Sequence, residues 1–204
     1  MRGLVPLMLL PCALAMAAPP SPSASEHLTE VALSGAVTSS RFTVTTMDYT
    51  VPEVQLVRDD GRRVSLPREL DDGRAVVLNF IFTSCSSICP LSSQTLAQFQ
   101  RDLGAERDQV HLVSISIDPE QDTPARLREY AKKFGAGRGW QHYTGSLEAS
   151  LAAQRAFDAD RGAKMSHSPV ILLRGADDRH WRRIDGFITP DELLGEYRKL
   201  PARH

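Results

Sequence analysis

Residues 75–90, AVVLNFIFTSCSSICP, contain the stretch of sequence that decides the fold. The run from Ala75 to Phe82 is almost entirely apolar, which is typical of a strand covered on both faces of its sheet. Cys85 and Cys89 follow it directly, where the chain leaves the strand and enters a helical pattern. Open α/β sheets place their functional sites at this edge. The stretch therefore predicts a central strand with a site at its carboxyl end.

A second apolar run, Val110 to Ile117, predicts another buried strand, and a helical pattern follows each run. Thr123 and Pro124 are a favourable N-cap and first residue for the second of these helices. The apolar stripes are Leu96, Phe99 and Leu103 in the first helix, ended by Gly104, and Leu127, Tyr130, Ala131 and Phe134 in the second, ended by Gly135.

The last third of the chain predicts a helix from Ser146, strands at Val170–Leu173 and Trp181–Ile184, and a closing helix from Thr189. The full order is β-α-β-α-(insert)-α-β-β-α. Helical crossovers make the early strands parallel, while the late pair can form a hairpin. This order predicts an α/β, thioredoxin-like fold, with a central mixed sheet flanked by helices and one insertion.

Short β patterns precede this core. Arg41–Thr46 and Glu53–Val57 are rich in β-formers, and Asp59-Asp60-Gly61 followed by Arg63–Leu66 is typical of a hairpin turn and its return strand. We expect an amino-terminal β-hairpin as a small appendage before the core.

The amino terminus differs in kind from the rest. Arg2 is followed by an apolar run, and Ala15-Met16-Ala17 has small residues where a signal peptidase cuts. We therefore predict a cleaved signal peptide over 1–17, a flexible Pro/Ser-rich linker over 18–40 and the folded domain over 41–204. The alternative is an uncleaved anchor, although the run is shorter than the roughly 20 residues of a spanning helix. Either interpretation makes the protein exported, and periplasmic or attached to the periplasmic side of the membrane.

The charge balance excludes one class of partner. Lys and Arg number 24 and Asp and Glu 25, so the net charge of −1 predicts no basic face for phosphate backbones or anionic lipid. Nucleic acid is therefore not an expected partner. Three cysteines are too few for a disulfide scaffold, so the Cys85 and Cys89 spacing points to chemistry.

A helix amino terminus stabilises a thiolate through its free N–H groups and dipole, which makes a cysteine both a nucleophile and a metal ligand. Four residues apart on a regular helix, the Cβ atoms of Cys85 and Cys89 would be about 5–6 Å apart, and a disulfide needs about 3.5–4.5 Å. A partly unwound loop could satisfy either a bound metal or a disulfide. The alternative is that both cysteines simply fill space beneath the helix.

His167 is the third candidate. It precedes the strand at Val170, and in thioredoxin-like folds the loop entering this strand packs against the cysteine turn, with Pro169 placed as the usual cis-proline. Two thiolates and one imidazole suit Cu(I) and can also hold Cu(II), whereas structural zinc normally needs a fourth ligand. The remaining histidines are expected to have surface or packing roles: His27, His111, His142, His180 and His204. A functional role is left open only for His142, which lies close to Trp140 in the sequence.

Asp118 follows the second core strand at the same sheet edge. A carboxylate there could orient a metal ligand without binding the metal, or help a proton move during thiol exchange. Asp122 and Thr123 are expected to form only a turn and a helix cap.

Three separated blocks of sequence carry a family resemblance. They are FIFTSCSSICP at 80–90, SISIDP at 114–119 with DTP at 122–124, and His167. Together they resemble the Sco/SenC family of thioredoxin-fold copper proteins. The resemblance implies copper bound by Cys85, Cys89 and His167, and a role in assembling the dinuclear copper centre of cytochrome c oxidase. The implied partners are the copper-accepting oxidase subunit and another periplasmic copper chaperone, close to a membrane.

Three functions compete on this sequence. The first is a copper metallochaperone without turnover, which His167 favours because a plain dithiol reductase does not need it. The second is an enzyme, a thiol-disulfide oxidoreductase that cycles Cys85 and Cys89 to keep acceptor cysteines reduced. The third is a thiol peroxidase, because Thr83 and Cys89-Pro90 are similar to the peroxiredoxin turn. That chemistry needs an arginine against the sulfur, and the sequence places none there.

Overall fold

The computed structural model describes residues 41–160, 162 and 168–201. The predicted leader (1–17), the predicted linker (18–40) and His167 lie outside the described residues. Among the residues described, no helix has the length and apolar character needed to cross a membrane.

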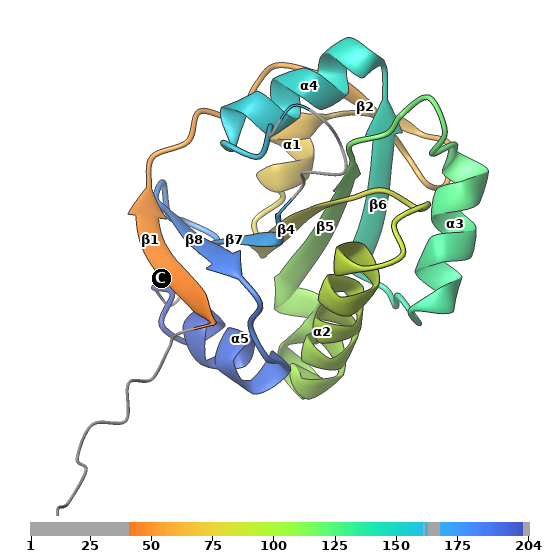
Figure 1. Cartoon of the computed structure of the whole chain (residues 1–204). Helices are drawn as coiled ribbons and strands as arrows, with labels where there is room; N and C mark the ends of the chain where they lie inside the picture. Colours follow the sequence, from red (N-terminus) through yellow and green to blue (C-terminus); the bar gives the residue numbers. More distant parts are fainter. Residues whose placement is uncertain (1–40, 161, 163–167, 202–204) are drawn as a thin grey trace, which may run out of the picture. The chain divides into compact units, whose positions relative to one another are not determined.

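A single eight-stranded sheet organises the described chain, in the order β1-β8-β7-β4-β5-β6-β2-β3 (Figure 1). Its strands are β1 (Phe42–Met47), β2 (Gln55–Arg58), β3 (Arg63–Ser65), β4 (Ala75–Ile81), β5 (Val110–Ser116), β6 (Trp140–Gly145), β7 (Val170–Arg174) and β8 (Trp181–Gly186). The helices are α1 (Leu66–Leu70), α2 (Ile88–Asp102), α3 (Pro124–Lys133), α4 (Leu147–Ala156) and α5 (Pro190–Tyr197), with a 3₁₀ helix η1 (Gly104–Gln109) after α2.

The sheet is mixed, as predicted. Strands β4, β5 and β6 run parallel, while β7 pairs antiparallel with β4 and β8 antiparallel with β7. Every residue of β4 and β5 is buried, which explains why these two strands are the apolar runs of the sequence. Helices α2, α3 and α5 cover one face, and α1 and α4 cover the other (Figure 1).

Two elements differ from the sequence-based expectation. The expected insertion between α3 and α4 contains strand β6, which pairs with β5 and completes the parallel core. Its sequence WQHYTG mixes aromatic and polar side chains, so it lacks the continuous apolar run that marks β4 and β5. The expected amino-terminal appendage is divided, because β1 pairs with β8 at one edge and the β2–β3 hairpin pairs with β6 at the other. Local sequence cannot reveal these pairings, since the partner strands are far away in the chain.

The predicted helix starts are confirmed. The side chains of Thr123 and Ser146 accept hydrogen bonds from backbone N–H groups in the first turns of α3 and α4, and Thr189 forms a reciprocal capping box with Glu192 at α5. Helix α2 is different, because its N-cap residue Ser87 makes no such side-chain bond. The free N–H groups at the start of α2 are therefore available to another partner.

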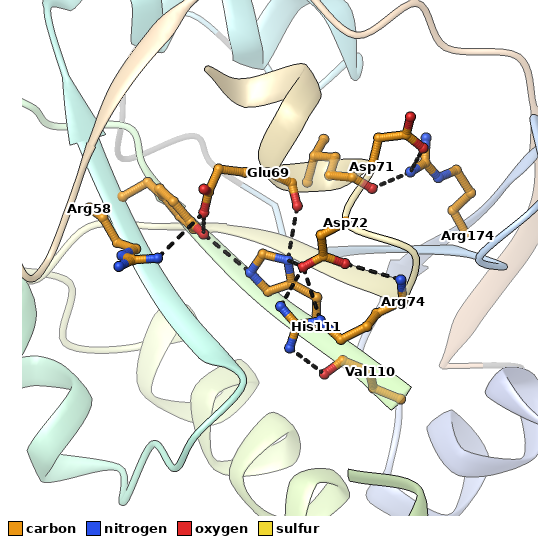
Figure 2. A network of polar contacts seen from close by, with 10 residues as sticks. Arg58, Glu69, Asp71, Asp72, Arg74, Val110, His111 and Arg174 are labelled. Atoms are coloured by element: carbon orange, nitrogen blue, oxygen red, sulfur yellow. Dashed lines mark hydrogen bonds and ion pairs between the residues drawn. The ribbon is translucent and has the colours of Figure 1, made fainter. Parts of the chain in front are cut away.

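A polar network holds the opposite end of the sheet, where β5 begins (Figure 2). The imidazole of His111 is only 2% exposed; Nδ1 lies 3.0 Å from the Glu69 carbonyl oxygen and 3.1 Å from an Asp72 carboxylate oxygen. Nε2 lies 3.2 Å from the hydroxyl of Tyr143, which donates at 2.7 Å to the Glu69 carboxylate. The network joins α1 to β5 and β6. Burial lowers the pKa of His111.

Candidate metal centre

Cys85 lies in the loop between β4 and α2, where its sulfur takes the place of a helix cap. The backbone N–H of Cys89 donates to Cys85 Sγ at 3.4 Å, and the Cys85 N–H closes a turn onto the Phe82 carbonyl at 3.1 Å. Helix α2 begins only at Ile88, so the loop around Cys85 is unwound, as the spacing argument required. The uncapped helix start therefore holds a sulfur atom.

The surroundings of Cys85 favour its thiolate. Partial burial by itself would raise the pKa, but backbone N–H groups of Cys89, Ser87 and Ile88, and the Cys89 thiol, act on the sulfur and lower it. The net result is a pKa below the ordinary value of a cysteine. Cys85 is also partly exposed, so a nucleophilic sulfur is accessible at this edge.

Cys89 has the opposite character. It is only 1% exposed, and its pKa is raised to about 12. Burial is the main cause, and the neighbouring Cys85 and Asp122 add to the rise. The expected stabilisation of a thiolate by the helix start therefore applies to Cys85, whereas burial dominates at Cys89. Both residues are free thiols. The pair combines one partly exposed sulfur with a lowered pKa and one buried thiol with a raised pKa.

Asp122 does more than the turn predicted for it. Its fully buried carboxylate accepts hydrogen bonds from the Thr83 N–H at 3.1 and 3.2 Å, the Thr83 hydroxyl at 2.5 Å and the Ser116 hydroxyl at 2.6 Å. These bonds join the loop after β5 to the start of the cysteine loop. No sequence pattern indicated this role, because Thr83 and Asp122 are 39 residues apart.

A second contact holds α2, the helix that contains Cys89. The hydroxyls of Ser93 in α2 and Tyr130 in α3 are 2.8 Å apart and buried. Burial raises the pKa of Tyr130, and so do Cys89 and Cys85, which places the phenol within electrostatic reach of both sulfurs. The sequence marked Tyr130 only as part of an apolar stripe; its hydroxyl contact depends on how α3 packs against α2.

Asp118 lies at the same sheet edge and is 6% exposed. Its N–H donates to the Ser116 hydroxyl at 3.0 Å, and its carbonyl accepts from the N–H groups of Gln121 and Asp122. These bonds shape the turn after β5. A role of its carboxylate toward a metal ligand stays a prediction.

The third predicted ligand, His167, is outside the described residues, and no group of three His, Cys, Asp or Glu side chains gathers for a metal within the described part. The described chain resumes before β7, where the Pro169 carbonyl accepts from the Gly186 N–H at 3.0 Å. The register pairs Asn79 of β4 with Ile171 of β7. Extended by two residues, it brings Pro169 beside Ile81, at the end of β4 where the cysteine loop begins.

The other histidines follow the expected packing and surface roles where they are described. His142 in β6 is fully buried and stacks on Trp140 with ring centroids 5.3 Å apart. Neither of its ring nitrogens has a hydrogen-bond partner among the described residues, and burial lowers its pKa to about 3. His180 is exposed and contacts Asp48 at 2.5 Å. His27 and His204 lie outside the described residues.

Comparison with known proteins identifies relatives over most of the chain. The SCO1/SenC family model matches residues 43–201. The SCO1 protein homolog of Bacillus subtilis is 32% identical over 160 residues, covering 74% of this chain and 82% of the relative. The copper-bound structure of Arabidopsis thaliana ScoI superposes with a TM-score of 0.61 at 28% identity, covering 72% and 94% of the two chains. BsSco, described as a member of the Sco family of cytochrome c oxidase assembly proteins with a disulfide switch, has a TM-score of 0.62 at 27% identity, covering 76% and 94%.

Proposed function

Because the chain belongs to the SCO1/SenC family, we propose that it binds one copper ion through Cys85, Cys89 and His167 and delivers it during cytochrome c oxidase assembly. The acceptor would be the oxidase subunit that holds the dinuclear copper centre, with another periplasmic copper chaperone as a second partner. The relatives support this proposal, since one is copper-bound ScoI and another is a cytochrome c oxidase assembly protein. The predicted leader supports an exported protein on the periplasmic side of the membrane.

The observation that carries the proposal is the sulfur of Cys85, held by the backbone N–H of Cys89 at the start of α2. Metal binding needs deprotonated sulfur, and this position favours the thiolate of Cys85. Copper bound there would lower the pKa of Cys89 in turn, because a coordinating thiol loses its proton to the metal. Two soft sulfur donors select Cu(I) over hard cations.

Chain geometry supports His167 as the third ligand. Consecutive Cα atoms are 3.8 Å apart, so a residue two positions before Pro169 is at most about 7 Å from it. When the β4–β7 register is extended by two residues, Pro169 falls beside the end of β4, from which the cysteine loop departs. An imidazole from this segment would therefore complete a three-coordinate copper site, and the buried Asp118 at the same edge would orient it.

A copper titration tests this proposal. The reduced protein is titrated with Cu(I) against a competing chelator, in parallel with His167→Ala and the double variant Cys85→Ser/Cys89→Ser. His180→Ala is the matched control, because that histidine is exposed and lies in the β7–β8 turn, at the other end of the sheet. We expect one tightly bound ion, lost in the double variant, weakened in His167→Ala and unchanged in the control. Weak binding that ignores His167 would reject the ligand set.

A thiol-disulfide oxidoreductase is the second candidate, favoured by the unequal cysteines. The Cys85 thiolate would attack a partner disulfide and form a mixed disulfide, and Cys89 would then displace the second partner sulfur as a thiol. The partner gains two electrons from the pair, one proton from the Cys89 thiol and one from water, while Cys85 and Cys89 become a disulfide that an external dithiol must reduce. The disulfide switch named for BsSco supports this alternative. Catalysed reduction of a model disulfide without copper, lost in Cys85→Ser, would favour it.

The peroxidase alternative gains no support from the groups that act on Cys85. Its pKa is set chiefly by burial, which raises it, and by backbone N–H groups and the Cys89 thiol, which lower it. No arginine is among these leading contributions.

A further inference from the structure

A groove runs between α2 and α3 and opens beside the cysteine loop. Its first hollow, about 290 Å³, is lined by loop and α3 residues, and its second, about 250 Å³, by α2 and α3 residues. Lys133 borders both hollows, so they adjoin. The lining residues are Thr83, Ser84, Arg126, Glu129, Tyr130 and Lys133 in the first hollow, and Gln94, Ala97, Arg101, Lys133 and Phe134 in the second.

The groove has a marked charge. Arg101, Arg126 and Lys133 are all exposed, whereas Glu129 is the only acidic residue in its lining. None of the three cations forms an ion pair with a carboxylate of the described chain. Arg101 and Arg126 donate instead to glutamine oxygens, and Lys133 lies over the Phe134 ring. Their positive charge is therefore not neutralised by the protein.

The segment that contains α3 carries further cations, although Arg128 and Lys132 border a separate hollow beside Asp59. Residues 124–138 contain five Lys and Arg side chains and one acidic side chain, within a chain whose net charge is −1. The overall balance conceals this local excess. Such a basic surface attracts an acidic partner and speeds its encounter with the neighbouring site.

The distance from the start of α2, beside the cysteine loop, to Arg101 at the far end of the second hollow suits an extended peptide segment. From the start of α2 to Arg101 is 13 residues, or about 20 Å of helix. An extended chain advances about 3.3 Å per residue, so about six residues cover this distance. A partner whose thiol meets Cys85 could therefore lay the next six residues along the groove.

We propose that the α2–α3 groove docks an acidic, extended segment of the protein that exchanges copper or a disulfide with Cys85. The occupant is identified by charge: three cations without carboxylate partners line the two hollows, and the first hollow is also lined by Thr83 and Ser84, the two residues before Cys85. The inference rests on the proposed function, because it assumes that a protein acceptor meets Cys85. Lys133, which borders both hollows, would hold the middle of the segment.

Two synthetic peptides test the proposal on the reduced full chain. Both carry a Cys-x-x-x-Cys pair followed by six residues, with aspartates at four of those positions in one peptide and asparagines in the other. Binding is followed by fluorescence anisotropy at low and high salt. We expect the acidic peptide to bind at least about tenfold more tightly at low salt, and this advantage to vanish at high salt.

Matched charge variants locate the effect. Arg101→Gln/Arg126→Gln/Lys133→Gln should lose the preference for the acidic peptide. The control Arg63→Gln/Arg68→Gln/Arg179→Gln removes the same charge from exposed positions outside the groove and should keep it. Equal loss in both variants, or equal binding of the two peptides, would overturn the groove as a docking site.

Copper binding by the same samples separates this inference from the proposed function. Normal Cu(I) affinity in the groove variant, together with lost peptide preference, supports both. Normal Cu(I) affinity in the wild type without any preference for the acidic peptide overturns the groove alone. A preference for the acidic peptide in a protein that does not bind Cu(I) overturns copper delivery and leaves the groove as the docking site of a thiol partner.

Discussion

The two ends of the central sheet use buried polar groups differently. At the carboxyl end of β4, backbone N–H groups hold an accessible sulfur on Cys85, and Asp122 fastens the loop from behind. At the amino end of β5, His111 is enclosed by Glu69, Asp72 and Tyr143, with no accessible reactive atom. Similar polar bonds therefore hold a partly exposed sulfur at one end and enclose a buried imidazole at the other. The two ends of the sheet differ in whether a reactive group remains exposed.

The largest difference expected is between the two thiols themselves. Burial raises the pKa of Cys89 to about 12, whereas backbone N–H groups lower that of Cys85, so a much larger fraction of Cys85 is deprotonated at neutral pH. Alkylation with iodoacetamide, mapped by mass spectrometry, should modify Cys85 almost alone. Equal modification of both residues would contradict the asymmetry at the carboxyl end.

A histidine without hydrogen bonds should control acid stability. The pKa of His142 is lowered to about 3, so the folded state resists its protonation and loses stability as pH falls below the unfolded value of about 6.5. His142→Phe has no group to protonate at this position. Between pH 7 and pH 4, the free energy of unfolding of this variant should therefore fall by roughly 3 kcal/mol less than that of the wild type. Urea unfolding at both pH values measures this difference in free energy. His180→Ala, at an exposed position, is the control. An unchanged pH dependence would show that water or another group pairs the ring.

The network at the amino end should contribute to stability alone. Tyr143→Phe removes the hydroxyl that joins Glu69 to His111, and unpaired buried groups of this kind cost about 1–3 kcal/mol. The free energy of unfolding should fall by this amount, while Cu(I) affinity stays the same. A parallel loss of copper affinity would mean that the two ends of the sheet are coupled.

Substitution of Asp122 should give the smallest loss of stability, and it should also weaken copper binding. In Asp122→Asn, an NH2 group replaces one carboxylate oxygen and cannot accept a hydrogen bond from Thr83 or Ser116. We expect the free energy of unfolding to fall by about 1 kcal/mol. Looser support of the cysteine loop should also weaken Cu(I) binding by about tenfold, as for other groups that orient metal ligands. Asp108→Asn, at an exposed position, is the control. Unchanged copper affinity in Asp122→Asn would limit the carboxylate to a structural role.

Some features could be predicted because their signal is local. The runs of β4 and β5 are buried on both faces, so their apolar character is visible without a partner. The caps at Thr123, Ser146 and Thr189 are equally local, since each acts on its own first turn. Strand β6 was missed because Gln141, His142 and Thr144 interrupt its apolar pattern.

The sequence by itself determined the α/β fold, the site of the cysteine pair at a strand end and the family resemblance, because each is recorded in short patterns that can be recognised without their spatial partners. Only the tertiary structure decided that Cys85 is partly exposed with a lowered pKa, while Cys89 is buried with a raised one. It also decided that Asp122 fastens the loop and that the cations of α2 and α3 border one groove. Burial, pKa and charge clustering depend on groups brought together from distant parts of the chain, and no local pattern records those distances.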